Sequence, residues 1–160
     1  MRKLLIILSL LMTILTHAQV KSVSLQASGL TCSMCSNSIT KALKSLSFVQ
    51  AVESDIKTYT YEISFNPNSA VDFDIIRKKV EAAGFAVSAF IINIHFPETE
   101  IKNDQPVVIL DKTFVFVNTQ DQVLTGDKKI TVLDKGFVTA KEFKKNSHLV
   151  SVPQTYHVTL

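Results

Sequence analysis

Residues 28–35 read S-G-L-T-C-S-M-C, and this short stretch decides how the first half of the chain folds. Its small and polar residues up to Met34 predict a loop. In the segment before it, residues 20–27, apolar side chains alternate with polar ones as in a half-buried strand; they are Val23, Leu25 and Ala27. After Cys35, apolar side chains recur at the spacing of one helix face: Ile39, Ala42, Leu43 and Leu46. The stretch therefore predicts a strand, a loop that contains Cys32, and a helix that begins near Cys35.

The elements that follow continue this alternation. Two strands are expected at residues 48–56 and 59–65, then a second helix, and then a strongly apolar strand at residues 85–94. Ser69, with Asp72 three residues later, resembles a capping box and predicts where the second helix begins.

The order of these elements over residues 20–95 is β-α-β-β-α-β, with Gly84 placed as the glycine that ends the second helix. This order predicts an α+β, ferredoxin-like arrangement, a four-stranded antiparallel sheet with two helices on one face. We assign residues 19–96 to this domain.

The rest of the chain is expected to be a separate, smaller unit. Residues 97–106, P-E-T-E-I-K-N-D-Q-P, are polar with a proline at each end and predict a linker. Beyond it, apolar runs at 107–117 and 129–133 indicate a mainly β module over residues 107–160. A unit of about 55 residues is marginal for independent folding unless it packs on the first domain.

Residues 1–18 have the pattern of a signal peptide. Arg2 and Lys3 precede an apolar run from Leu4 to Leu15, and Ala18 ends a stretch suited to cleavage. The run is short for a transmembrane helix, which needs about 20 apolar residues, although an uncleaved anchor is the alternative. We expect export, to the periplasm of a gram-negative cell, without stable membrane insertion.

The charge of the chain argues against several classes of function. Loss of Arg2 and Lys3 would lower the 17 Lys and Arg residues to 15, against 14 Asp and Glu. No basic stripe with interleaved aromatic residues is present, so a nucleic-acid partner is not expected. No Ser-His-Asp set, phosphate loop or convincing acid–base pair is present either, so no catalytic residue is assigned and the protein is not expected to be an enzyme.

Cys32 and Cys35 are the only cysteines, and their spacing lets two sulfur atoms meet at one ion. A disulfide across so short a loop would constrain the unfolded chain little, which favours a chemical role for the pair. Thiolates select soft ions such as Cu(I), and the start of a helix favours the thiolate form. Ag(I) and Hg(II) also suit two ligands, whereas a closed structural Zn(II) site needs four.

In this context the chain resembles the heavy-metal-associated domain family, which includes copper chaperones, modules of copper-pumping ATPases and periplasmic mercuric-ion-binding proteins. The matching residues are Gly29, Leu30, Thr31, Cys32 and Cys35, together with Ala83, Gly84 and Phe85. The family most often has Met at the position of Leu30. The resemblance implies that Cys32 and Cys35 carry the metal ion and pass it to a partner protein with a similar thiolate site. It also places Phe85 beside the metal, where it either shields the site or is simply a core aromatic residue.

Other interpretations stay open at this point. The same pair of cysteines would serve a thiol–disulfide exchange protein, although Ser33 and Met34 between them are unlike the residues of thioredoxin-like proteins. His95, His148 and His157 lack metal-ligand spacing, and surface or packing roles are favoured over a second metal site. Zn(II) is a further candidate for the ion, and the protein is expected to be a monomer or a metal-bridged dimer.

Overall fold

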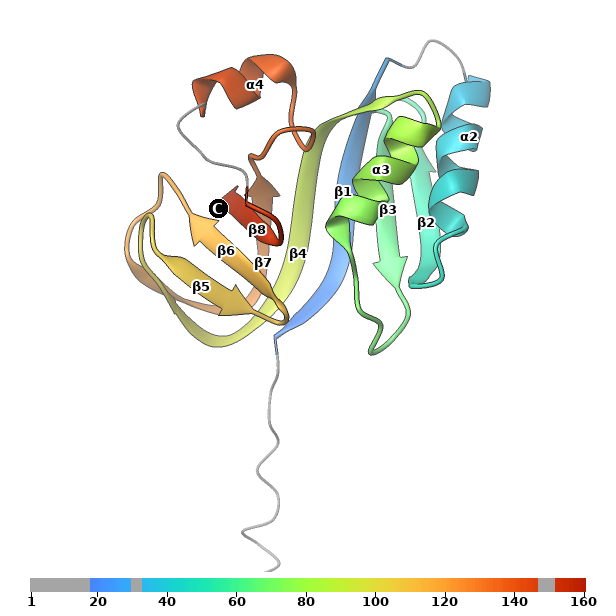
Figure 1. Cartoon of the computed structure of the whole chain (residues 1–160). Helices are drawn as coiled ribbons and strands as arrows, with labels where there is room; N and C mark the ends of the chain where they lie inside the picture. The colour runs from blue at the N-terminus through green and yellow to red at the C-terminus, as the bar shows by residue number, and fades with distance from the viewer. Residues whose placement is uncertain (1–17, 30–32, 147–151) are drawn as a thin grey trace, which may run out of the picture.

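The computed structural model describes residues 18–29, 33–146 and 152–160 (Figure 1). Its helices are α2 (Ser33–Lys44), α3 (Phe73–Ala82) and α4 (Ala140–Lys145). Its strands are β1 (Gln19–Ser28), β2 (Val49–Asp55), β3 (Thr60–Phe65), β4 (Ala86–Ile101), β5 (Pro106–Ile109), β6 (Lys112–Phe116), β7 (Gln122–Val132) and β8 (Thr155–Thr159). Within these ranges, no helix has the length and apolar character needed to cross a membrane.

The first half of the chain has the predicted ferredoxin-like arrangement. Strands β2, β3, β1 and β4 lie side by side in that order and pair antiparallel, and α2 and α3 cover one face of the sheet (Figure 1). The alternating apolar residues of β1 are buried, as their spacing predicts: Val23, Leu25 and Ala27. The α+β fold class is therefore confirmed.

Helix α3 begins differently from the prediction. Asp72, not Ser69, is the N-cap residue, and its side chain accepts a hydrogen bond of 3.0 Å from the backbone N–H of Ile75. The Ser69 hydroxyl instead donates to the carbonyl of Asn66 (2.7 Å) in the turn after β3. The predicted capping box is wrong because Asp72, read as its fourth residue, itself caps the helix.

The end of α3 follows the prediction. Gly84 adopts a φ of +92°, a conformation that side-chain-bearing residues rarely adopt. Its N–H donates to the carbonyl of Glu81 (2.9 Å), and the N–H of Phe85 donates to the carbonyl of Val80 (3.2 Å). This pair of bonds is a Schellman motif, and it turns the chain from α3 into β4.

The segment predicted as a linker, residues 97–106, is not one. Strand β4 continues through it to Ile101, and residues 99–101 pair with β7. The ladder is irregular between Phe96 and Thr99, so Pro97, which has no N–H to donate, lies at a bulge. Only a short turn then separates β4 from β5.

Beyond β4 the sheet simply continues. The full strand order is β2-β3-β1-β4-β7-β8-β6-β5, and all neighbours pair antiparallel except β6 and β8. The strand expected at 107–117 is a hairpin of β5 and β6, with Leu110 at a φ of +61° in its turn. Strand β4 thus belongs to both halves of the molecule, pairing with β1 along one edge and β7 along the other (Figure 1).

Aromatic side chains join the two halves into one core. Phe137, from the loop before α4, meets the ring of Phe90 on β4 at 5.0 Å and that of Tyr156 on β8 at 5.8 Å. Tyr156 also contacts Phe73 of α3 at 5.4 Å and donates its hydroxyl to Asp74 (3.0 Å). The described part of residues 107–160, predicted as a separate module, therefore shares a sheet and a hydrophobic core with the first half.

A buried polar pair fastens β8 to the end of β7. Both Asp134 and His157 are buried, and one carboxylate oxygen of Asp134 lies 2.8 Å from Nδ1 of His157. The other oxygen accepts the backbone N–H of His157, also at 2.8 Å. Because each oxygen has a partner, the carboxylate is satisfied without solvent, and His157 acts in packing.

Candidate metal centre

Cys35 lies in the first turn of α2, two residues after the helix begins, and its side chain is partly exposed. No acidic residue neutralises this turn, while Lys41 and Lys44 occupy the last turn at the opposite end. The free N–H groups and partial positive charge of a helix start stabilise a thiolate. Cys32, the second predicted ligand, lies outside the described residues, so the pairing of the two sulfur atoms stays a prediction.

The chain enters this region through a glycine. Strand β1 ends at Ser28, and Gly29 follows with a φ of +86°. A residue with a side chain would be strained there by its backbone, although no heavy atom lies within 4 Å of where a Cβ would stand. Gly29 is therefore needed for the turn rather than for close packing.

A hydrogen bond beneath the first turn of α2 supports Cys35 from the core. The hydroxyl of Tyr61, on β3, donates to the side-chain oxygen of Ser36 at 2.9 Å, and both residues are buried. Burial raises the pKa of Tyr61, the hydrogen bond with Ser36 lowers it, and the charge interaction with Cys35 raises it, so that the pKa lies above the usual value for tyrosine. Tyr61 therefore stays a neutral donor next to Cys35.

Sequence reasoning placed Tyr61 in a strand but missed this supporting role. The alternation along residues 59–65 already predicts that one face is buried, and a buried tyrosine hydroxyl needs a partner. This need for a hydrogen-bond partner is the feature of the sequence from which a supporting role of Tyr61 could have been inferred. It does not identify Ser36 as the partner, because Ser36 and Tyr61 are 25 residues apart in the chain.

We expect Tyr61→Phe to lower the free energy of unfolding by about 1–2 kcal/mol, because it leaves the buried Ser36 hydroxyl without this donor. Urea unfolding of residues 19–160 measures the change. Tyr59→Phe is the matched control, because the Tyr59 hydroxyl makes no hydrogen bond that the described residues show and should change stability by less than about 0.5 kcal/mol. Equal effects of the two substitutions would contradict a specific Tyr61–Ser36 bond.

Phe85 follows Gly84 and directly precedes β4. Its side chain is partly buried and packs against the hydrophobic core, as does that of Ala83. This contact gives Phe85 a packing role, and shielding of a bound metal stays a prediction.

The histidines that the sequence offered as other ligands have different partners. Nδ1 of His95 lies 2.6 Å from Asp127, whose other oxygen pairs with Lys21 at 2.5 Å. The hydrogen bond from Lys21 and then that from His95 lower the pKa of Asp127. His157 pairs with Asp134, and His148 lies outside the described residues. Across the part of the chain that the structure describes, no group of three or more His, Cys, Asp or Glu side chains is arranged to hold a metal ion.

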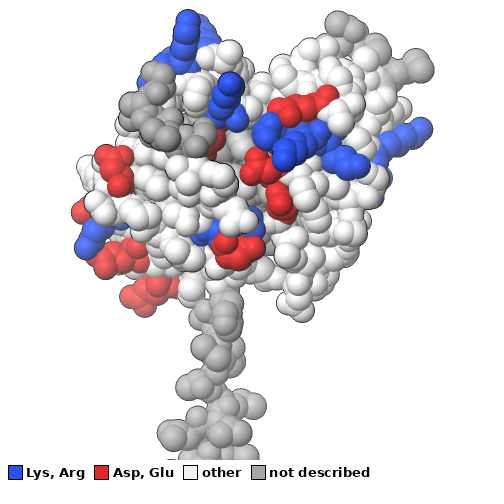
Figure 2. Space-filling view, in the orientation of Figure 1, with Lys and Arg blue, Asp and Glu red and all other residues white. Residues whose placement is uncertain are grey.

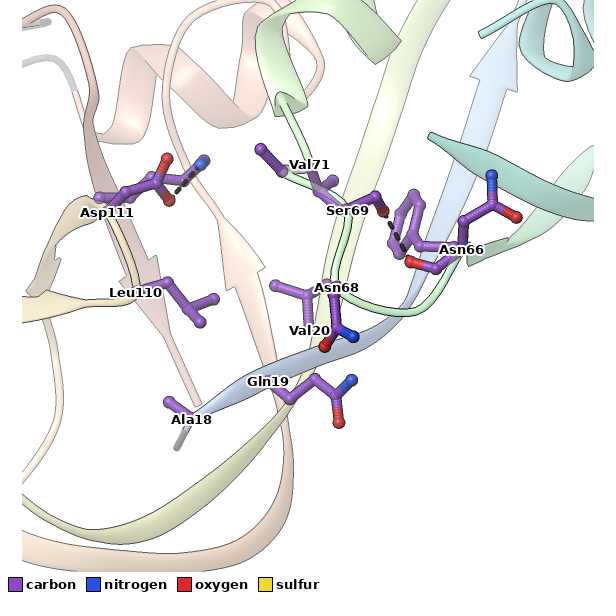
Figure 3. Close-up of a pocket in the computed structure, with 12 residues that line it drawn as sticks. Ala18, Gln19, Val20, Asn66, Asn68, Ser69, Val71, Leu110 and Asp111 are labelled. Atoms are coloured by element: carbon purple, nitrogen blue, oxygen red, sulfur yellow. Dashed lines mark hydrogen bonds and ion pairs between the residues drawn. The ribbon is translucent and has the colours of Figure 1, made fainter. Parts of the chain in front are cut away.

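A hollow of about 680 Å³ lies at the end of the sheet where β1 begins (Figure 3). Val20, Asn68 and Leu110 line it, together with Asp111, which forms an ion pair with Lys112 at 2.7 Å. The hollow includes the start of β1, whereas Gly29 and α2 follow its end. A ten-residue strand separates the two by roughly 30 Å, so the hollow is not part of the metal centre.

Comparison with known proteins identifies this half of the molecule. The sequence model of the heavy-metal-associated domain family matches residues 24–86, and this stretch is a heavy-metal-associated domain. It is similar to the probable copper-transporting ATPase HMA5 of Arabidopsis thaliana, with 41% identity over 63 residues. That alignment covers 39% of this chain and only 6% of the length of the ATPase.

Two solved structures are similar over the same half. The yeast copper transporter domain Ccc2a, solved in apo and Cu(I)-loaded states, is 28% identical with a TM-score of 0.38, over 42% of this chain and 90% of that one. A copper-binding domain from HMA7, a P-type ATPase, is 29% identical with a TM-score of 0.37, over 41% and 86%.

Proposed function

We propose that this protein binds Cu(I) through the thiolates of Cys32 and Cys35 and passes the ion to a partner protein with a similar thiolate site. The observation that carries the proposal is the partly exposed Cys35 in the first turn of α2, inside a heavy-metal-associated domain. The probable copper-transporting ATPase with 41% identity over this region supports copper as the ion, and thiolate ligands favour its Cu(I) state. Two sulfur ligands also suit Ag(I) and Hg(II), and Zn(II) is the weaker alternative.

Transfer rather than storage follows from the small number of ligands. A two-coordinate ion keeps room for a third sulfur atom, which a partner would supply before the first ligand leaves. In the described residues no group of three or more His, Cys, Asp or Glu side chains is arranged to enclose an ion. A carrier of this kind needs no catalytic residue, and it works as a monomer or as a dimer bridged by the metal.

A competition titration of reduced protein, residues 19–160, against a chromophoric Cu(I) chelator tests the proposal. We expect about one ion per chain, held tightly enough to take Cu(I) from the chelator. Weak binding would refute the carrier function. The cysteines would then be tested for thiol–disulfide exchange, by looking for turnover of a disulfide substrate and a trapped mixed disulfide in each single Cys→Ser variant.

We further propose that residues 1–18 are a signal peptide and that the protein works in the periplasm. Strand β1 begins at Gln19, so cleavage after Ala18 would leave the sheet whole. We expect the full chain, expressed in a gram-negative bacterium, to accumulate in the periplasmic fraction with Gln19 as its first residue. Mass spectrometry of the intact protein measures this, and an uncleaved chain in the membrane fraction would contradict it.

A further inference from the structure

A groove of about 840 Å³ runs between α4 and the edge of the heavy-metal-associated domain. Ala86 and Val87, at the start of β4, line one side, and Val138 and Phe143 line the other. Helix α4 has no buried residue, so Phe143 keeps part of its ring open to solvent. In Figure 1, α4 lies away from the sheet, at the end of the sheet where β4 begins.

The rim of the groove carries positive charge that no acidic residue in the described part of the chain neutralises. Lys135, Lys141 and Lys144 are exposed there, and none of them forms an ion pair with another described residue. The acidic residues nearby already have partners, since Glu142 pairs with Lys145 (3.1 Å) and Glu81 pairs with Arg77 (2.7 Å). Lysine side chains accordingly project at the α4 end of the molecule in Figure 2.

The groove also lies at the metal-binding end of the fold. Ser28 lines it, and Ser28 is the last residue of β1 before Gly29 and the cysteine-containing region. Figure 1 shows α4 and the beginning of α2 at the same end of the sheet. A molecule seated in the groove would thus lie at the same end of the sheet as the start of α2, where Cys35 is located.

We propose that this groove docks an acidic, partly apolar segment of the protein that exchanges the metal ion with Cys35. The lysines select carboxylates, and the apolar walls accept one or two side chains, which would complete the burial of Phe143. A concave groove fits a protein segment better than the flat surface of an anionic membrane. The inference names the partner of the proposed metal site and therefore rests on that function.

Binding of a cysteine-free peptide tests the groove without any metal. The probe is acetyl-Glu-Asp-Leu-Glu-Asp-Phe-Glu-amide, titrated into 15N-labelled protein of residues 19–160 at low salt. We expect saturable amide shifts confined to residues around Val87, Gly136 and Phe143, which weaken as salt screens the charges. A control peptide with Lys at each acidic position should leave these amides unchanged.

Two matched double variants separate the groove from general positive charge. We expect Lys141→Gln/Lys144→Gln to weaken peptide binding by roughly 2- to 30-fold, the effect of losing two exposed ion pairs. Lys128→Gln/Lys129→Gln removes the same charge from exposed positions on β7, outside the groove, and should leave the affinity unchanged. Equal effects of the two variants, or shifts spread over the whole surface, would overturn the proposal. Binding to vesicles that contain phosphatidylserine, with none to the peptide, would also overturn it.

A second form of the peptide, extended by a Gly-Ser linker and a C-x-x-C end, links the groove to transfer. Stopped-flow measurement should show faster Cu(I) transfer from the protein to this acceptor than to its Lys-containing counterpart, and Lys141→Gln/Lys144→Gln should abolish the difference. If the protein fails to bind Cu(I), the proposed function fails while peptide binding still tests the groove. If it binds Cu(I) but transfers equally fast to both acceptors, only the groove proposal fails.

Discussion

Cys35→Ser is expected to lower the affinity for Cu(I) by more than about 100-fold, because even the loss of a partner outside the ligand set commonly costs 10–100-fold. A serine hydroxyl is a hard ligand with a pKa far above that of a thiol, so it does not replace the lost thiolate at neutral pH. The competition titration described above measures the change. Cys32→Ser and the double variant should give losses at least as large.

The fold should survive this substitution. Cys35 is partly exposed, and Ser and Cys differ little in size, so we expect the melting temperature to stay within a few degrees of the wild-type value. His95→Gln is the matched control for binding, because it removes a different metal-binding side chain from an exposed site. If His95→Gln lowers the affinity and Cys35→Ser does not, the assignment of the metal to the cysteines is wrong.

Phe137→Ala is expected to lower the free energy of unfolding by about 3–5 kcal/mol, the usual cost of removing a buried phenylalanine. The ring is 3% exposed and touches Phe90, Tyr156 and the guanidinium group of Arg77, which lies 5.4 Å from its centre. It thus fills the space between β4, β8 and α3. The melting temperature should fall by roughly 10 °C.

This substitution also tests whether the two halves fold as one unit. Because they share β4 and a hydrophobic core, we expect one cooperative transition in the wild-type protein and in the variant, seen alike by near-ultraviolet circular dichroism and by hydrogen exchange. Phe143→Ala is the matched control, since its partly exposed ring should contribute less than about 1 kcal/mol. Two separate unfolding transitions, of which Phe137→Ala shifts only one, would show that residues 107–160 form an independent module.

The local pattern of residues 97–101 does not reveal that they belong to a strand. Residues 97–101 look like a polar connection because Glu98 and Glu100 face solvent, and Pro97 interrupts the alternation that would indicate a strand. The strand conformation of residues 99–101 comes from pairing with residues 122–124 of β7, which lie far along the chain. Backbone pairing of this kind leaves little trace in composition, because the hydrogen bonds join main-chain groups that every residue carries.

Some features of the candidate site could likewise be predicted from the sequence, and others could not. Spacing and residue type offered Cys32 and Cys35 as candidate ligands, since soft-metal binding needs two thiolates close together in the chain. Their place between a predicted strand and a predicted helix strengthened this prediction. The Tyr61–Ser36 bond and the groove beside α4 join residues that are distant in sequence, so neither was predicted. The capping of α3 is a local feature, and the sequence allowed either Ser69 or Asp72 as the N-cap residue. The structure has Asp72.

The sequence by itself determined the β-α-β-β-α-β order, the ferredoxin-like arrangement of the first half and the residues offered as metal ligands. Each of these depends on periodicity or spacing within a short window, where the chain's own geometry links neighbours. Only the tertiary structure decided that β4 continues into a single eight-stranded sheet, that β8 enters it parallel to β6, and that Phe137 and Tyr156 close one shared core. The reason is that sheet pairing and core packing depend on contacts between distant segments, which form only when the whole chain has folded.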